Sequence, residues 1–295
     1  MNQHLEIRNF LIQALEANSE EKSIQWLKQK AQKIQESNSS TPLFLAFSQA
    51  SRFFSKDLLI LSEQEKIQVD QLVSAFEPAH WNRLQAARSF LLLNLPQEKE
   101  SWFSAMNQLF ETADMHEQHA LFAALPILPF QEDLLTRAID GCRTNMTLIF
   151  DAVALNNPYP ASYFPEANWN QLVLKAVFMQ RPLYRIQGLE ERRNSALAEI
   201  ASDFAHERWA AGRNVMPELW RLVAPFMNDQ YLADLEKVLN STDDLELAGG
   251  VLTLYESDFA PAKALLADYP DLLAQVESGQ ITWQKIGKEY QDSRV

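Results

Sequence analysis

Residues 131–160 read QEDLLTRAIDGCRTNMTLIFDAVALNNPYP and contain the pattern that organises this chain. Apolar side chains recur at spacings of three and four residues, which is the period of one face of an α-helix. This stretch predicts a helix over 131–155, followed by a rigid turn at 156–160, because each proline restricts its own backbone and that of the preceding residue. The predicted buried stripe consists of Leu135, Ala138, Ile139, Cys142, Met146, Ile149, Phe150 and Val153.

The same alternation of periodic segments and prolines continues along the chain. Only 7 of 295 residues are glycine, which disfavours strand-rich and dinucleotide-binding folds that need many tight turns. Short helices joined by proline-containing turns pack as antiparallel pairs. We therefore expect an all-α fold, an irregular α-solenoid or HEAT-like array of antiparallel helix pairs, although no clean repeat is visible. Helices are predicted at 2–17, 20–36, 42–55, 63–76, 80–94, 98–111, 115–125, 131–155, 168–180, 190–211, 216–225, 229–240, 244–255, 260–267 and 271–277.

A single all-α domain over 1–295 is the simplest organisation. It would comprise N-terminal helices at 1–79, a middle segment at 80–226 and acidic C-terminal helices at 227–295. The polar run 37–41 is short enough to be an interhelix loop. The last stretch, 278–295, is weakly periodic, and we expect it to dock only partly.

Charge and cysteine usage limit the function classes. The net charge of −13 argues against nucleic-acid binding and against docking on anionic lipid, since both need a basic surface. Cys142 is the one cysteine, which fits a reducing compartment. The first residues lack the basic start and apolar run of a signal peptide, and no apolar stretch approaches the roughly 20 residues that span a bilayer. We expect a soluble cytoplasmic protein that is not an integral membrane protein.

Arginine is concentrated in the middle of the chain. Residues 140–225 contain eight Arg and one Lys, whereas Lys outnumbers Arg elsewhere. Arginine is preferred where a planar donor must be held in a partly buried site. The middle segment is therefore either a binding region or a buried ion-pair network.

Three polar clusters in this segment supply candidate ligand-binding residues. They lie at 141–146, at 156–160 with 168–171, and at 206–213. Arg143 lies in or beside the stripe of helix 131–155, and Arg208 falls on the apolar stripe of helix 190–211, which includes Ile200 and Phe204. An unpaired buried guanidinium is costly, so each must have a partner or a ligand. Gly141 in mid-helix costs roughly 1 kcal/mol relative to Ala, which suggests a close backbone approach or a helix break. The full candidate set is Arg143, Asn145, Asp151, Asn170, Lys175, His206, Glu207, Arg208 and Arg213.

Two shorter patterns have structural explanations. Asn168 and Gln171 have the spacing of a capping box, which leaves Asn170 and Lys175 without a structural role. Asp114 and Glu117 form a second such pattern. The nearby histidines, His116 and His119, lack the His-Glu-x-x-His spacing of a metal site. The sequence also contains no phosphate-binding loop and no nucleophile elbow. We expect no metal and no cofactor.

At several strings the chain resembles the EboA-domain family. The matching strings are LFETAD at 109–114, EQ at 117–118, RTNM at 143–146, NPYPA at 157–161, WNQLVLKA at 169–176, AHERWAAGR at 205–213 and PELWR at 217–221. The resemblance covers roughly 80–226. It implies a place in bacterial and algal-plastid gene clusters that also encode a membrane prenyltransferase, a TatD-like hydrolase, a sugar-phosphate-isomerase-like protein and a dehydroquinate-synthase-like cyclase. That setting implies synthesis or export of a prenylated or cyclitol-like metabolite, and it supplies no catalytic residue.

Three functions remain open from the sequence. The preferred one is an accessory protein that binds an anionic small molecule in an Arg-lined pocket. The second is an enzyme on the same ligand class, with His206 or Asp151 as general base. The third is a helical scaffold for protein partners from the same gene cluster, with Trp169, Trp209 and Trp220 as interface anchors. A fourth reading is that the arginines only satisfy buried carboxylates and helix ends.

Overall fold

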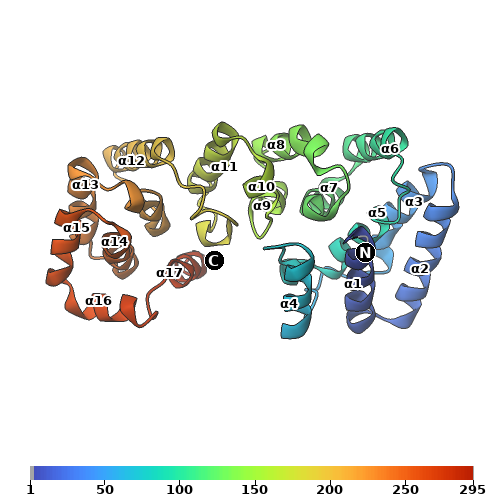
Figure 1. Ribbon diagram of the computed structural model, residues 1–295, viewed down its shortest axis with the longest axis horizontal. Coiled ribbons are helices and arrows are strands. Elements are labelled where there is room, and N and C mark those ends of the chain that lie inside the picture. Colours follow the sequence, from blue (N-terminus) through green and yellow to red (C-terminus); the bar gives the residue numbers. More distant parts are fainter. Residues whose placement is uncertain (1–2, 295) are drawn as a thin grey trace. The chain divides into compact units, whose positions relative to one another are not determined.

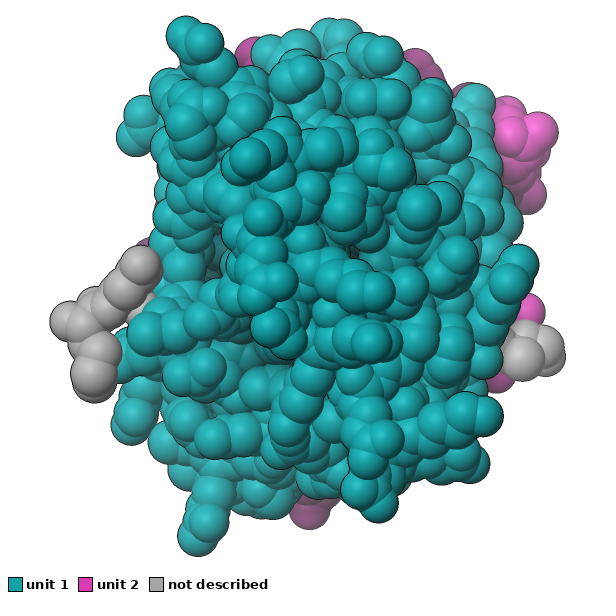
Figure 2. Space-filling model, turned by 90° about the vertical axis from the view of Figure 1, so that its right-hand side faces the viewer, with its two compact units in different colours: residues 1–164 teal, residues 165–295 magenta. Residues whose placement is uncertain are grey.

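The computed structural model describes residues 3–294, and these residues form an all-α fold, as predicted (Figure 1). The one extended pairing among them is an isolated antiparallel bridge between Leu58 and Asn82. No helix in this range has the length and apolar character to cross a membrane. The chain divides into two compact units, Met1–Phe164 and Pro165–Val295, coloured teal and magenta in Figure 2. The HEAT-like stacking and the single-domain organisation over 1–295 stay predictions.

Unit 1 is built around α5, whose residues are almost all buried. This helix packs against α1, α2, α3 and α7, and α7 packs in turn against α9. The α-helices of unit 1 are α1 Gln3–Asn18, α2 Glu21–Glu36, α3 Thr41–Gln49, α4 Glu63–Leu72, α5 Arg83–Leu92, α6 Lys99–Thr112, α7 Met115–Ala123, α8 Leu135–Arg143, α9 Thr147–Ala154 and α10 Tyr159–Tyr163. Short 3-10 helices lie at η1 Ala50–Arg52, η2 Pro78–His80, η3 Leu125–Ile127 and η4 Gln131–Leu134.

Four helices of unit 1, α4 to α7, begin directly after a residue whose side chain caps them. Asp114 accepts the N–H of Glu117 at 2.8 Å, and the Glu117 carboxylate accepts the N–H of Asp114 at 3.0 Å. This confirms the predicted capping box and explains why α7 begins at Met115. Asn82 and Gln85 make the same reciprocal bonds at the start of α5.

The predicted helix over 131–155 is two α-helices and a 3-10 turn. The backbone is extended at Thr144 and Met146, so α8 ends at Arg143 and α9 begins at Thr147. Ala138, Cys142, Ile149, Phe150 and Val153 are buried as predicted, whereas the break leaves Met146 42% exposed. Gly141 lies inside α8 rather than at the break. Its close neighbour is the ring of Phe122, not another backbone.

Unit 2 centres on the buried helix α14, which contacts η6, α13, α16 and α17. Its α-helices are α11 Glu166–Phe178, α12 Ser195–Ala210, α13 Asp229–Leu239, α14 Asp244–Glu256, α15 Ala260–Leu265, α16 Pro270–Glu277 and α17 Trp283–Asp292. Its 3-10 helices are η5 Leu183–Arg185, η6 Pro217–Leu222, η7 Ala224–Phe226 and η8 Leu266–Asp268.

Three predictions for unit 2 were wrong. The segment 216–225 forms two 3-10 helices rather than an α-helix. Helix α11 begins at Glu166 after Pro165, so Asn168 lies within the helix and is not a cap. The stretch after 278 forms α17, and Trp283, Ile286 and Gly287 are buried. Gly287 lies so close to Tyr184 and Glu218 that an added Cβ would be 2.4 Å and 2.6 Å from their side chains.

Gly141→Ala should destabilise unit 1. The new Cβ would stand 2.6 Å from Phe122 Cε1, and that ring is buried and packed against Phe110. We expect overpacking to cost about 1–3 kcal/mol, which exceeds the roughly 1 kcal/mol that Ala gains in helix propensity. Urea unfolding measures the loss. Adding Phe122→Leu should restore part of it, and a Gly141→Ala protein as stable as the wild type would contradict this packing.

Candidate functional site

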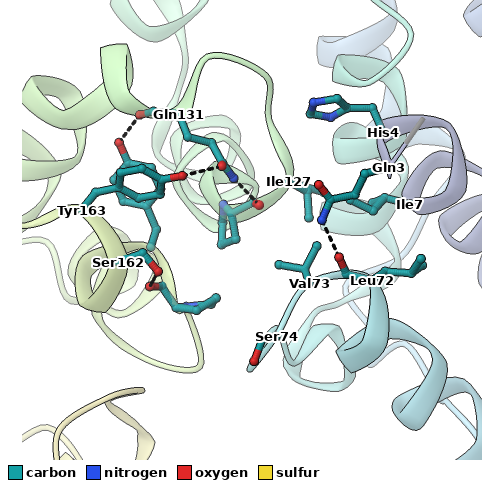
Figure 3. Close-up of a pocket in the computed structure, with 13 residues that line it drawn as sticks. Gln3, His4, Ile7, Leu72, Val73, Ser74, Ile127, Gln131, Ser162 and Tyr163 are labelled. Carbon is teal, nitrogen blue, oxygen red and sulfur yellow. Dashed lines mark hydrogen bonds between the residues drawn. The ribbon is translucent and has the colours of Figure 1, made fainter. Parts of the chain in front are cut away.

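A cavity of about 260 Å³ lies within unit 1 and is lined by the NNPYP segment (Figure 3). Its walls come from the start of α1, the end of α4, η3, η4 and α10. This volume is just below the roughly 300–1,000 Å³ usual for ligand pockets, so it fits a small molecule. The lining residues are Gln3, His4, Ile7, Leu72, Val73, Ser74, Pro126, Ile127, Gln131, Pro158, Tyr159, Ser162 and Tyr163.

Asn157 fixes the backbone that forms one wall of this cavity. Its side chain is 3% exposed, and Nδ2 donates to the carbonyl oxygens of Phe122 at 3.2 Å and Ala152 at 2.8 Å. Both carbonyls are in the last turns of their helices, where the usual N–H partner four residues on is missing. Its Oδ1 accepts the N–H of Tyr159 at 3.0 Å. Asn157 therefore joins the ends of α7 and α9 and positions the start of α10.

Two tyrosines on α10 meet the same glutamine. The Tyr159 hydroxyl donates to the Gln131 carbonyl oxygen at 2.5 Å, and the Tyr163 hydroxyl donates to Gln131 Oε1 at 2.7 Å (Figure 3). Gln131 Nε2 donates to the carbonyl oxygen of Pro126. The spacing of four residues places both rings on one face of α10, with centroids 4.7 Å apart. The result is a hydrogen-bonded chain across η3, η4 and α10.

Burial keeps both phenols neutral. It raises the pKa of Tyr159, with a further contribution from neighbouring Tyr163. It also raises the pKa of Tyr163, to which the charge of Glu132 adds. Each hydroxyl donates its one proton to Gln131, so further hydrogen bonds at its oxygen can only be accepted. Ser162 likewise donates its hydroxyl proton to the Pro158 carbonyl oxygen at 3.1 Å.

The described lining residues include no Lys, Arg, Asp or Glu. Such a cavity offers neutral acceptors and the apolar side chains of Ile7, Val73 and Ile127. Its chemistry suits a small uncharged molecule that carries hydroxyl or N–H donors and one apolar face.

In unit 2 the conspicuous charges form a buried network around Glu218. This carboxylate is fully buried and accepts the N–H groups of Leu183 at 3.2 Å and Tyr184 at 2.5 Å. Arg221 lies 3.4 Å from it and also pairs with Glu190. Burial raises the pKa of Glu218 to about 7, although Arg221 and the two backbone donors oppose the shift.

The network continues from Glu190 to the C-terminal helices. Arg193 pairs with Glu190 at 2.8 Å and with Glu256 at 3.3 Å. Trp283 Nε1 donates to Glu256 at 2.7 Å, and the Arg221 guanidinium lies over the Trp283 ring at 5.6 Å. Arg221 thus satisfies the buried carboxylate of Glu218, as the structural interpretation of the sequence proposed, whereas Arg193 pairs with the less buried Glu190 and Glu256.

The predicted site residues of unit 1 lie apart from the cavity. Arg143 has 69% of its side chain exposed and pairs with Asp140 at 3.2 Å, so it does not lie on the buried stripe. Asn145 is exposed in the break between α8 and α9, and Asp151 is partly buried in α9. None of the three lines the cavity.

Asn170 has a structural role that the sequence did not reveal. It is buried, and it exchanges hydrogen bonds of 2.8 Å and 3.1 Å with Asn194. Asn194 caps α12 by accepting the N–H of Leu197 at 2.9 Å. Lys175 is partly buried in the last turn of α11. The ligand-binding roles of both residues stay predictions.

The candidates on and after α12 lie near its C-terminal end. His206 Nε2 is 2.6 Å from Asp234 Oδ1. Arg208 donates from Nε and Nη2 to the Asn214 carbonyl oxygen at 3.0 Å and 2.8 Å, which anchors the chain as it leaves the helix. Glu207 and Arg213 are exposed. Ile200 is 43% exposed, so the predicted apolar stripe was wrong at that position.

The sequence predicted a rigid turn at 156–160 but not that Pro158 and Tyr159 line a cavity, and it did not single out Gln131 or Tyr163. The spacing of four residues between Tyr159 and Tyr163 was an available signal that they share a helix face.

The two histidines of α7 have separate contacts. His116 Nε2 lies 2.9 Å from Lys56 Nζ, and His119 Nε2 lies 3.1 Å from Gln85. Burial lowers the pKa of His119 to about 4.

The buried Glu218 should make unit 2 less stable as pH rises. Its folded pKa of about 7 exceeds the unfolded value of 4.5, so the folded state holds the proton longer. Unfolding free energy should therefore fall between about pH 4.5 and 7, by an amount of the order of 3 kcal/mol. Glu218→Gln should flatten this slope in urea titrations, whereas Glu207→Gln, at an exposed carboxylate, should keep it. An unchanged slope in Glu218→Gln would contradict the assignment.

Comparison with known proteins identifies one family. Residues 7–224 match the family described as metabolite traffic protein EboA. No curated protein and no solved structure matches the chain. The match includes Asn157, Gln131 and both cavity tyrosines, and it ends before Glu256 and Trp283. Because the match covers more than half of the 295 residues, the chain belongs to the EboA family of metabolite traffic proteins.

Proposed function

We propose that this protein is an accessory protein of metabolite traffic that binds a small, uncharged, hydroxyl-bearing molecule in the unit 1 cavity. The family description supports a role with a metabolite. The observation that carries the proposal is the Tyr163 hydroxyl, which donates its proton to Gln131 and keeps its oxygen as an acceptor, while the fully buried Tyr159 holds the Gln131 backbone in place. A cyclitol-like molecule presents hydroxyl donors around a ring and an apolar ring face, which is the complement of this lining.

The anionic ligand expected from the sequence has weaker support at its predicted residues. Arg143 and Arg208 each make polar contacts within their own unit, to Asp140 and to the Asn214 carbonyl oxygen. An anion there would compete with these contacts. Binding of an anionic small molecule by Arg143, Lys175, Arg208 and Arg213 stays a prediction.

The enzyme and scaffold alternatives also have less support than binding. Neither His206 nor Asp151 lines the cavity, so a general base at either would act elsewhere. Trp169 and Trp220 are 0% and 1% exposed and cannot serve as interface anchors. Trp209 is partly covered by Lys237, whose Nζ lies 4.0 Å from the ring centroid. Association with protein partners from the same gene cluster, and a cytoplasmic location, remain part of the proposal.

Tyr163→Phe should weaken binding of an uncharged cyclitol. The variant removes one acceptor from the cavity and leaves the ring in place, so affinity should fall roughly 2–10-fold, corresponding to one hydrogen bond of about 0.5–1.5 kcal/mol. Calorimetric titration with myo-inositol and related neutral cyclitols measures the change. Tyr255→Phe, at an exposed tyrosine of unit 2, is the matched control.

Two results would overturn the proposed function. One is the absence of binding for every neutral cyclitol, polyol and phenol tested at millimolar concentration. The other is a ligand whose affinity is the same in the wild type and in Tyr163→Phe. A ligand that instead loses affinity in Arg143→Ala or Arg208→Ala would support the Arg-held anion.

A further inference from the structure

A second cavity of unit 1 has the opposite chemistry. It has a volume of about 390 Å³ and lies where the turn between α1 and α2 meets the segment after η1 and the start of α5. Its lining includes Ser19, Lys22, Arg52 and Arg83. None of these residues was a candidate in the sequence analysis.

The walls of this cavity are fixed by hydrogen bonds and stacking. Ser23 Oγ donates to the Phe53 carbonyl oxygen at 2.8 Å, and Trp26 stacks on the Phe53 ring with centroids 4.2 Å apart. The N–H of Arg83 donates to the Asp57 carbonyl oxygen at 2.9 Å. These contacts hold the segment 53–57 against both α2 and α5, so the cavity is pre-formed.

Two polar atoms at this cavity lack partners. Arg83 Nε and Ser19 Oγ are buried, and neither has a hydrogen-bond partner among the residues that the structure describes. A buried donor without a partner is destabilising, so a ligand that accepts hydrogen bonds from both atoms would be stabilised there. This observation points to an acceptor-rich ligand.

The charge balance of the cavity favours an anion. Lys22, Arg52 and Arg83 bring three positive charges, against Glu20 and Asp57. The Asp57 carboxylate already accepts the Ser55 hydroxyl at 2.7 Å and stands 3.9 Å from Arg83 Nη1.

We propose that this cavity, between α1, α2 and α5, binds the phosphate group of a small phosphorylated molecule. A phosphate monoester has three terminal oxygens, so it can accept hydrogen bonds from Arg83, Ser19 and Lys22 at the same time. A carboxylate has only two oxygens. The site goes beyond the proposed function, because its residues and its ligand charge differ from those of the tyrosine-lined cavity.

Titration with inorganic phosphate and with phenyl phosphate tests this site. Calorimetry should show saturable binding to the wild type, and Arg83→Gln should lower the affinity about 10–100-fold, as expected for loss of a charge-assisted hydrogen bond. Arg137→Gln removes an equal charge from a partly exposed arginine elsewhere in unit 1 and should leave the affinity unchanged. Arg52→Gln, at an exposed side chain, serves as a second variant whose folding does not depend on buried packing.

The outcomes separate this site from the first cavity. Tyr163→Phe should leave phosphate affinity unchanged, and Arg83→Gln should leave cyclitol affinity unchanged. The proposal fails if the wild type shows no saturable phosphate binding at millimolar concentration. It also fails if Arg137→Gln weakens binding as much as Arg83→Gln, because the effect would then be a general response to net charge.

Discussion

The side chain of Asn157 is the constraint on which the first cavity depends. One amide satisfies carbonyl oxygens at the ends of α7 and α9 and also accepts the N–H that begins α10. Buried polar groups without partners are costly, so these three bonds define one arrangement of the turn. Tyr159 and Tyr163 then face Gln131, and the cavity acquires its acceptors. The positions of the binding groups therefore follow from backbone hydrogen bonding in a turn of two asparagines and two prolines.

The charges of the Glu218 network in unit 2 and those at the second cavity of unit 1 are paired differently. In unit 2, Arg193 and Arg221 are neutralised by Glu190, Glu218 and Glu256, and this network joins η6 to α14 and α17. Each of its carboxylates is paired with an arginine, although Arg221 Nε has no hydrogen-bond partner among the described residues. In unit 1, within the described range, Arg83 has a carboxylate partner at 3.9 Å, and its buried Nε has no hydrogen-bond partner. What sets Arg83 apart is that it lines a cavity together with Lys22 and Arg52.

Local features were predictable from the sequence, and long-range pairing was not. Helical periodicity predicted the all-α fold, and the Asp114–Glu117 capping box depends on residues three apart. The rigid turn at 156–160 was predictable because its prolines act locally, whereas its place at a cavity was not. Gln131 could not be assigned to the site, since it meets Tyr159 from 28 residues away. Likewise, the sequence shows that arginines need partners but not that Arg193 would find Glu256, 63 residues along the chain. The break after Arg143 followed from backbone geometry at Thr144 and Met146, which an uninterrupted apolar pattern concealed.

The proposed function requires that an uncharged metabolite binds beside the tyrosines of α10. Mapping of backbone amide shifts during titration with a neutral cyclitol would locate the bound molecule. The largest shifts should occur at Val73, Gln131, Ser162 and Tyr163, which line the cavity. Shifts centred instead on Lys175, Arg208 and Arg213 would contradict it and would place the metabolite at the arginines of unit 2.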